Sequence, residues 1–337
     1  MKLLLTLLSG VFLIAFLPSP AQSQERPFTT ENVEPFLPEV RQANKQIAFF
    51  HPDMSTPAGL SMVRAVFGAP GGKTILQPQD KFIHGEGGKI RIRIFRPDTI
   101  RAVLFDIHGG GLVAGRPEST DSLNDAIARY CKVAVVSIDY RLAPENAFPA
   151  ALLDCDSLAV WLLRNAQIEF GTNKLILSGY SAGAYLAALT LLDIRDKFHG
   201  IDKVIGINFF YGVFDLSGTP SARQVGRNSL IIDSAFMNQD RQAVFPGKSA
   251  EDLRSPSYSP LYANLKGLPS ALFSVGTLDP LIDDTNFMSD RWEAAGNSAN
   301  LYVYPECPHG FNLQKTQLAR LANKRVGDWI NGILNGK

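Results

Sequence analysis

The segment Gly-Tyr-Ser-Ala-Gly at 179–183 places Ser181 directly after a short apolar run, 175–177, and at the start of a helical pattern. A nucleophile on a sharp strand-to-helix turn takes strained backbone angles, and flanking glycines remove the clashes that side chains would make there. The helix that begins at this point would also direct amide N–H groups at developing negative charge. The five letters alone are a weak signal, but this context favours Ser181 as the nucleophile of an acyl transfer.

A second candidate is the His-Gly-Gly-Gly segment at 108–111, which follows the apolar run 102–107. Attack on an ester carbonyl creates an oxyanion, and a glycine-rich loop lets backbone N–H groups approach that charge closely. A plain turn at the end of a strand usually needs one glycine, so three in succession favour a catalytic role. We expect His108 to shape this loop and not to transfer protons.

A serine hydroxyl is a weak nucleophile until a base takes its proton. His309 lies just past the last predicted strand and is our candidate for that base. Asp279 is the first acidic residue after the run 271–275, so it is the candidate that orients the histidine. Asp283 and Asp284 are the alternatives to Asp279, and they could instead cap the helix that follows.

The other histidines have no partner motif. We expect these three to be surface residues: His51, His84 and His199.

These candidates require a scaffold that brings distant segments together. The alternation of apolar and charged residues at 90–94 predicts a strand with one face in water. Further short apolar runs predict strands at 102–107, 133–138, 175–177, 204–210, 271–275 and 301–304. Helical patterns lie between several of them, at 149–164, 182–195, 286–295 and 317–334. This order predicts an α/β fold with a mostly parallel central sheet that helices cover on both faces.

Two stretches interrupt the pattern. Residues 216–258 show no clean alternation and contain several Gly, Pro and Ser residues, and residues 24–72 precede the first strand. A long segment without strands in a regular α/β chain is often a functional insertion. We expect a core at 73–337, with both stretches forming a cap over the active site; plain surface loops are an equal alternative.

The composition excludes some classes of function. The chain of 337 residues has 33 Lys and Arg against 32 Asp and Glu, and no basic run, so a nucleic-acid partner is not expected. The three cysteines lie far apart, without a Cys-x-x-Cys pair, which argues against a zinc site. Two could form a disulfide, or all three could be buried thiols: Cys131, Cys155 and Cys307.

The first residues are typical of a secretory signal peptide. Lys2 precedes an apolar run at 3–17, and prolines and the small residues Ala21 and Ser23 follow. The run is shorter than the roughly 20 apolar residues that span a bilayer. We expect cleavage after Ser23, export to the periplasm or the medium, and no stable membrane anchor.

Together these motifs resemble the hormone-sensitive-lipase-like esterases (bacterial family IV) of the α/β-hydrolase fold. The order Ser181, Asp279, His309 is that of the fold and differs from chymotrypsin and subtilisin. The other matches, between about 102 and 312, are His108 to Gly111 with Gly115, Tyr140 to Glu145, Phe148 to Ala150, Ser259 to Leu261, Gly276 to Leu281 and His309 to Phe311.

The resemblance implies a triad of Ser181, Asp279 and His309, and an oxyanion hole formed by the N–H groups of Gly109, Gly110 and Ala182. It also implies a cap, no metal or organic cofactor, and hydrolysis of carboxylic esters with short to medium acyl chains. The partner would be a small-molecule ester substrate. A homodimer is a further possible partner arrangement that the sequence leaves open.

The chain departs from the usual family pattern at two places in the nucleophile segment. Tyr180 stands where the family most often has Asp, and Gly183-Ala184 replaces Gly-Gly. Neither change removes a reacting group, but details of the pocket cannot be transferred. An amidase or formamidase could use the same groups. A binding protein that has lost catalysis is the alternative from another class, and it would be expected to lack one of these groups.

Overall fold

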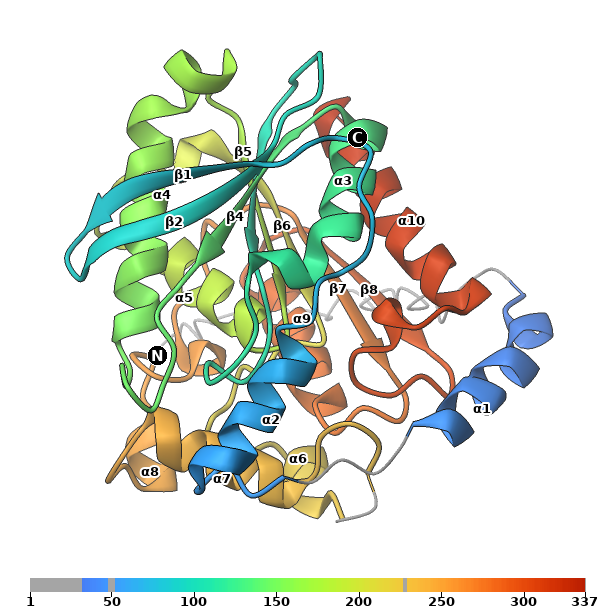
Figure 1. Cartoon of the computed structure of the whole chain (residues 1–337). Coiled ribbons are helices and arrows are strands. Elements are labelled where there is room, and N and C mark those ends of the chain that lie inside the picture. The colour runs from blue at the N-terminus through green and yellow to red at the C-terminus, as the bar shows by residue number, and fades with distance from the viewer. Residues whose placement is uncertain (1–31, 48–51, 227–228, 337) are drawn as a thin grey trace, which may run out of the picture.

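The computed structural model describes residues 32–47, 52–226 and 229–336, so the predicted leader at 1–23 and His51 lie outside the described residues. An eight-stranded sheet in the order β1-β2-β4-β3-β5-β6-β7-β8 forms the centre (Figure 1). Strands β3 to β8 are parallel to one another, whereas β2 is antiparallel to both of its neighbours, β1 and β4. The strands are β1 (Gln79–Gly85), β2 (Gly88–Phe95), β3 (Val103–Ile107), β4 (Ala134–Asp139), β5 (Leu175–Tyr180), β6 (Val204–Phe210), β7 (Ala271–Gly276) and β8 (Ala299–Tyr304).

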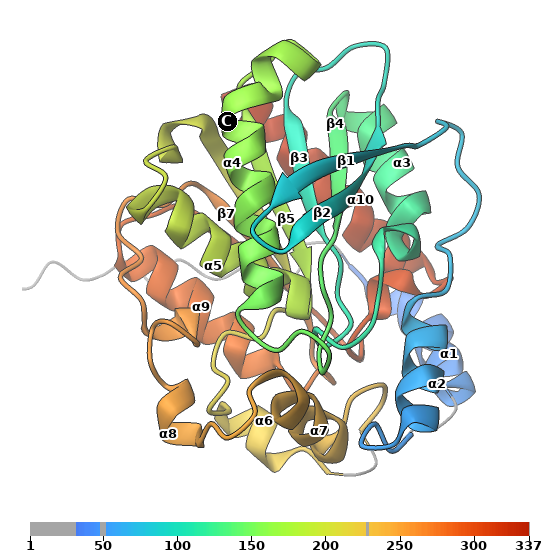
Figure 2. The ribbon, with the colours of Figure 1, turned by 60° about the vertical axis from the view of Figure 1, so that its left-hand side comes forward.

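Helices cover both faces of this sheet, as the two views in Figures 1 and 2 show. On one face lie α4 (Ala150–Phe170), α5 (Ala182–Asp196) and α9 (Ile282–Ala294), and on the other lie α3 (Asp121–Cys131) and α10 (Gln317–Leu334). Every residue of β3, β5 and β7 is buried. Central parallel strands are mostly apolar because both of their faces are covered.

All predicted strands and the four predicted helices are present, which confirms the α/β prediction with a mostly parallel sheet. Neither β1 nor α3 was predicted from the sequence. β1 is an edge strand whose residues are mostly exposed, so it mixes polar and apolar residues without an apolar run. The predicted strand at 90–94 is the centre of β2.

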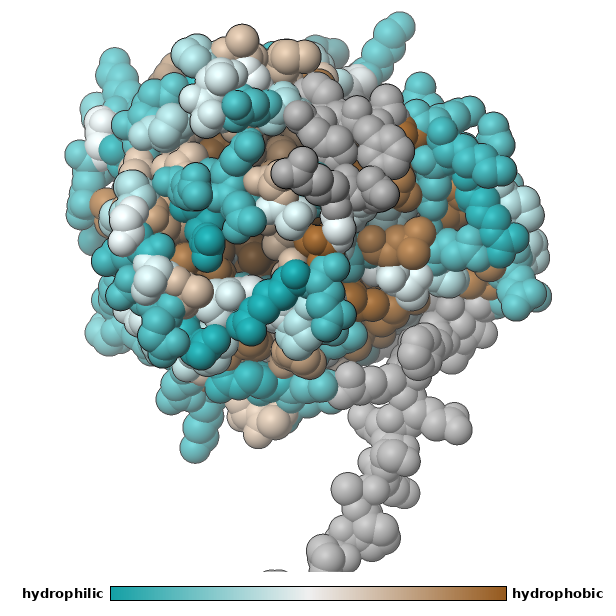
Figure 3. All heavy atoms as spheres, turned by 90° about the horizontal axis from the view of Figure 1, so that it is seen from below, coloured by the Kyte–Doolittle hydropathy of each residue, from teal (hydrophilic) through white to brown (hydrophobic). Residues whose placement is uncertain are grey.

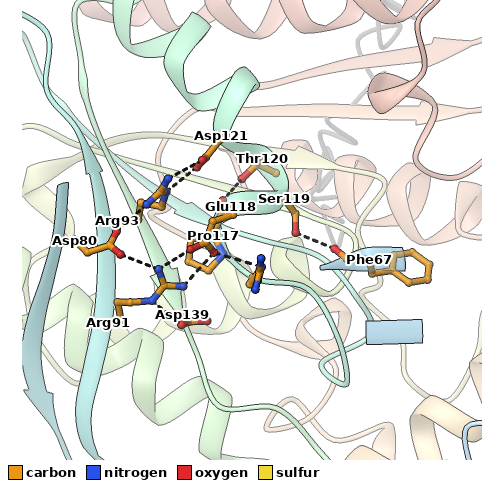
Figure 4. Close-up of polar contacts among 11 residues, drawn as sticks. Phe67, Asp80, Arg91, Arg93, Pro117, Glu118, Ser119, Thr120, Asp121 and Asp139 are labelled. Atoms are coloured by element: carbon orange, nitrogen blue, oxygen red, sulfur yellow. Dashed lines mark hydrogen bonds and ion pairs between the residues drawn. The ribbon is translucent and has the colours of Figure 1, made fainter. Parts of the chain in front are cut away.

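The charged face of β2 is covered by carboxylates instead of lying open to water, as Figure 4 shows. Arg91 bonds Asp80, Glu118 and Asp139, while Arg93 bonds Asp80 and Asp121. The two hydrogen bonds from Arg91 to Glu118, at 2.6 and 3.0 Å, lower the pKa of the Glu118 carboxyl to about 2. These contacts fasten the segment before α3 to the β1–β2 hairpin.

Short helices lie beyond the carboxyl ends of the strands, at the bottom of Figure 1: α2 (Pro57–Phe67), α6 (Pro220–Gln224), α7 (Ser234–Val244) and α8 (Ala250–Leu253). The described part of 216–258 contains no strand, as predicted. The end of α2 is attached to the core through the Ser119 hydroxyl, which donates to the Phe67 carbonyl at 2.8 Å (Figure 4). A further helix, α1 (Leu37–Gln46), lies near the start of α10, where its Glu39 side chain accepts from the Gln317 N–H at 2.8 Å.

Of the two alternatives left open, the structure agrees with three buried free thiols and not with a disulfide: Cys131, Cys155 and Cys307. Burial raises the pKa of Cys131 and Cys307 to about 12, which keeps these thiols protonated and unreactive. Within the described ranges, no helix has the length and apolar character needed to cross a membrane.

Candidate active site

Ser181 lies on the sharp turn between β5 and α5. Its backbone angles are φ 54° and ψ −122°, a strained conformation for a residue with a side chain. A Cβ atom on Gly179 would lie 2.3 Å from the Gly183 carbonyl oxygen, and one on Gly183 would lie 2.0 Å from that of Ile107. Both positions therefore require glycine, and the turn presents the Ser181 side chain at the carboxyl edge of the sheet.

The structure brings Ser181, His309 and Asp279 together, although 128 residues separate the serine from the histidine. His309 Nε2 lies 2.9 Å from Ser181 Oγ, and His309 Nδ1 lies 2.9 Å from Asp279 Oδ2. The backbone N–H of Leu281 donates to the other Asp279 oxygen at 2.9 Å. Asp279 and His309 are buried. Each residue follows the end of its own strand, and parallel strands end at the same edge of the sheet.

The alternatives Asp283 and Asp284 do not reach His309, and the prediction that they cap α9 is wrong. The N-cap residue of α9 is Leu281, without a side-chain cap. Asp283 instead accepts from the Ser221 N–H at 2.8 Å. Asp284 accepts from the N–H groups of Phe214 and Asp215 and from the Thr219 hydroxyl.

These bonds tie the beginning of the 216–258 segment to α9. Burial raises the pKa of the Asp284 carboxyl to about 7.

The glycine loop after β3 lies against Ser181: a Cβ atom on Gly109 would be 3.3 Å from Ser181 Cβ. Gly110 has φ 118°. Among the described residues, no carbonyl accepts from the N–H of Gly109 or Gly110. Ala182 is the first residue of α5, where N–H groups have no partner within the helix. All three N–H groups predicted for the oxyanion hole therefore belong to segments that adjoin Ser181.

His108 shapes this loop, as expected from the sequence. Its Nδ1–H donates to the Gly109 carbonyl at 2.8 Å, and its ring stacks on Tyr140 with centroids 4.1 Å apart. The Tyr140 hydroxyl donates to the His108 carbonyl at 2.9 Å. Burial lowers the pKa of His108 to about 4, so its ring stays neutral at ordinary pH.

Arginine–carboxylate pairs hold the segment that follows Tyr140. The Arg141 guanidinium bonds Asp154 at 2.8 Å, and Arg64 of α2 bonds Glu145 at 2.6 Å. The second pair joins α2 to the core.

His84 and His199 are exposed, as predicted.

Ser181 and His309 face a cavity of about 920 Å³. Its walls come from the glycine loop, from α2 and α7, and from the segment after β6. Figure 3, seen from below, shows hydrophobic surface among hydrophilic residues at this end of the molecule. Such a site buries an apolar ligand while a few polar groups orient it. No cluster of three His, Cys, Asp or Glu that could hold a metal occurs in the part of the chain that the structure describes.

Two residues of this cavity carry no motif and were not identified from the sequence. Tyr211 directly follows β6, has φ 40°, and places its ring 4.6 Å from that of His309; its hydroxyl bonds Asn312. Its position at a strand end is the signal that could have identified it. The other residue is Asp240 on α7, whose helical spacing from buried apolar neighbours is informative only once the helix is known.

Comparison with known proteins shows the family to which the chain belongs. The family model described as "alpha/beta hydrolase fold" matches residues 104–313, more than half of the chain. The chain is similar to two acetyl esterases from Salmonella. The one from Salmonella schwarzengrund is 27% identical over 244 residues, and the one from Salmonella paratyphi A is 28% identical over 252 residues. Each alignment covers 72% of this chain and 75% of the relative.

Solved esterases have the same fold. An esterase from Pyrobaculum calidifontis aligns with a TM-score of 0.78 and 30% identity, covering 88% of this chain and 98% of its own. Esterase LipW from Mycobacterium marinum aligns with a TM-score of 0.74 and 27% identity, covering 90% and 97%. The chain therefore belongs to the hormone-sensitive-lipase-like (bacterial family IV) esterases of the α/β-hydrolase fold and is a carboxylesterase-type serine hydrolase.

Proposed function

We propose that Ser181, His309 and Asp279 are the nucleophile, base and orienting acid of this esterase. The observation that carries the proposal is the unbroken hydrogen-bonded chain from Asp279 through His309 to Ser181, with 2.9 Å at each step, at the wall of an apolar cavity. These distances are those required of a nucleophile, its base and the group that orients the base.

The reaction proceeds in two halves through an acyl-enzyme. His309 Nε2 takes the hydroxyl proton while Ser181 Oγ attacks the ester carbonyl, and His309 returns the proton to the leaving alcohol. Water then attacks the acyl-serine, with His309 as base again, and the acid is released. Asp279 holds the proton on Nδ1, so that Nε2 is free to accept one, and stabilises the imidazolium that forms.

The N–H groups of Gly109, Gly110 and Ala182 are the donors that we assign to the oxyanion. The free N–H groups of Gly109 and Gly110 and the first N–H of α5 support this assignment. Donors fixed in advance by the fold need no reorganisation as the charge develops, and loss of one typically costs about 100- to 1000-fold in rate.

The substrate we propose is an ester with a short to medium acyl chain. The relatives of this chain in Salmonella are acetyl esterases. Residues 24–72 and 216–258 act as the cap, since α2 and α7 contribute walls to the cavity above Ser181. The cap limits the length of chain that can enter and keeps bulk water from the acyl-enzyme.

We also propose that residues 1–23 direct export to the periplasm or the medium and are removed. The basic start, the apolar run and the small residues at 21 and 23 support this. Mass spectrometry of the exported chain should find Gln24 as the first residue, and a chain that retains residues 1–23 would contradict cleavage.

Hydrolysis of p-nitrophenyl esters from acetate to palmitate tests the catalytic proposal. We expect the highest kcat/KM for short chains, and loss of this activity in Ser181→Ala with an unchanged circular dichroism spectrum. Full activity in the folded variant would contradict the assignment of Ser181. If folded wild-type protein hydrolyses amides but not these esters, the proposed substrate class is wrong.

A further inference from the structure

One face of α7 carries an acidic residue between two buried apolar ones. Phe236, Asp240 and Val244 are four residues apart, so they lie on the same side of the helix. Phe236 and Val244 are buried, and all three residues line the cavity beside Ser181. Burial of a carboxylate without a partner is unfavourable. The packing of α7 therefore gives no reason for an acid at this position.

Among the residues that the structure describes, the Asp240 carboxylate has no hydrogen-bond or ion-pair partner. Its Oδ1 is buried and forms no hydrogen bond among the described residues. Its Oδ2 lies against the glycine loop, where a Cβ atom on Gly111 would be 2.0 Å away. Burial raises the pKa of the Asp240 carboxyl well above its usual range. A cation in the cavity would stabilise the ionised carboxylate and supply the missing interaction.

The position of the carboxylate is fixed by bonds on both sides of it. The Gln239 side chain accepts from the Met54 N–H at 2.9 Å, and the Val244 carbonyl accepts from the Phe148 N–H at 3.0 Å. The Asp233 side chain caps the start of α7 through the Phe236 N–H at 2.8 Å. A carboxylate on a helix held at its start, middle and end is preorganised for binding.

Aromatic side chains of the same cavity can also contact a cation. Aromatic rings of Tyr185 and Phe245 line the same cavity, and aromatic faces attract quaternary ammonium groups. Two arginines at the cavity wall bond side chains other than Asp240: Arg254 pairs with Glu251, and Arg241 donates to the neutral Asn238 amide. A third, Arg223, is exposed.

We propose that Asp240 determines specificity by binding a cationic group carried by the ester substrate. The Asp240 carboxylate lies against Gly111, which follows Gly109 by two residues on the glycine loop, and these residues line the same cavity as Ser181. The inference rests on the proposed function, because it requires the ester to occupy this cavity. It assigns the substrate class as ammonium-bearing esters, with the aromatic rings surrounding the cation and Asp240 neutralising it.

The test compares two butyrate esters of the same shape: the charged 2-(trimethylammonio)ethyl ester and the uncharged 3,3-dimethylbutyl ester. Hydrolysis is followed by titration of the released acid at constant pH. Wild-type protein should prefer the charged ester, and Asp240→Asn should lower kcat/KM for it by about 10- to 100-fold. The uncharged ester should change less than about 2-fold in that variant, because the variant keeps the shape of the side chain.

Asp202→Asn is the matched control, since it removes an exposed carboxylate before β6, at the opposite edge of the sheet. It should leave both esters unchanged. Asp240→Asn should also keep or raise the Tm, because it removes an unpaired buried acid. An equal loss for both esters, or no loss for either, would overturn the proposal.

A binding measurement separates this inference from the catalytic proposal. Butyltrimethylammonium should bind folded Ser181→Ala protein in calorimetry, and the additional Asp240→Asn substitution should weaken that binding about 10-fold or more. This result needs no hydrolysis, so it holds even if Ser181 is not the nucleophile. Equal affinity in the two variants would overturn the role of Asp240 while leaving the esterase proposal intact.

Discussion

At the scale of single residues, the backbone fixes the positions of the catalytic side chains. Ser181 has φ 54°, and the glycines on either side of it have carbonyl oxygens too close for any Cβ atom. Asp279 is fixed by the Leu281 N–H, which leaves its other oxygen for His309. Preorganisation of this kind lets the groups act without rearrangement during the reaction.

Asp279→Asn should lower kcat for p-nitrophenyl butyrate by about 10⁴-fold with little change in KM, since an amide favours the wrong His309 tautomer. Asp283→Asn is the matched control and should retain nearly full activity, because Asp283 bonds Ser221 and not His309. Steady-state kinetics of the two variants test this. Loss of activity in Asp283→Asn but not in Asp279→Asn would contradict the assignment.

Most of these residues could be predicted from the sequence because their chemistry restricts which residue types and neighbours work. A glycine pair around a serine and a glycine run after a strand are local patterns that the structure reproduces. Tyr211 and Asp240 could not be predicted in this way, since a lone tyrosine or aspartate has no local requirement. Their importance comes from tertiary contacts with His309 and Gly111.

At the scale of elements, the ends of the strands position the catalytic residues, and hydrogen bonds and ion pairs hold the neighbouring segments in place. The Pro117–Thr120 turn links three of them: Glu118 bonds Arg91 of β2, Ser119 bonds the end of α2, and α3 follows directly. The cavity wall formed by α2 therefore depends on a charged cluster on the β1–β2 hairpin (Figure 4).

Glu118→Gln should lower the free energy of unfolding at pH 7 by about 1 to 2 kcal/mol, a modest value because the pair is partly exposed to solvent. The folded-state pKa of Glu118 is about 2 against an ordinary value of 4.5. As pH falls from about 4.5 to about 2, the unfolded chain takes up a proton that the folded chain does not, and the stabilisation is lost.

Urea unfolding at several pH values measures this effect. The difference between wild type and Glu118→Gln should be constant above pH 5 and narrow below about 4.5. Glu293→Gln is the control, since Glu293 is exposed on α9. A difference that widens at low pH would contradict the role of the Arg91–Glu118 pair.

The elements themselves were predicted with unequal success for a physical reason. Central strands and the long helices have apolar patterns imposed by burial, and these patterns can be recognised in the sequence alone. The edge strand β1 is mostly exposed and so lacks that constraint. The helix α3 is half buried, but three of its buried residues are polar and form hydrogen bonds, which breaks the apolar pattern: Asp121, Asn124 and Asp125. The short helices α6 to α8 depend on contacts such as those of Asp284, which no local pattern indicates.

At the scale of the whole molecule, the sheet positions the catalytic residues, and the irregular segments form the cavity that the substrate must enter. Ser181, Asp279 and His309 lie together beyond the carboxyl ends of the strands. Helices α2 and α7 form walls of the cavity that Ser181 and His309 face. The scaffold fixes the reaction class, whereas α7 and α2 set the shape and charge of the cavity. Substrate preference should therefore change with substitutions on α7 while the catalytic chemistry persists.

Covalent labelling of the whole chain tests the central claim most directly. A fluorophosphonate should add one phosphonyl group to the folded protein, and peptide mass spectrometry should place it on Ser181. His309→Ala should react far more slowly, since the hydroxyl then has no base. A label on another residue, or none on folded protein that still hydrolyses esters, would contradict the assignment of Ser181 as the nucleophile.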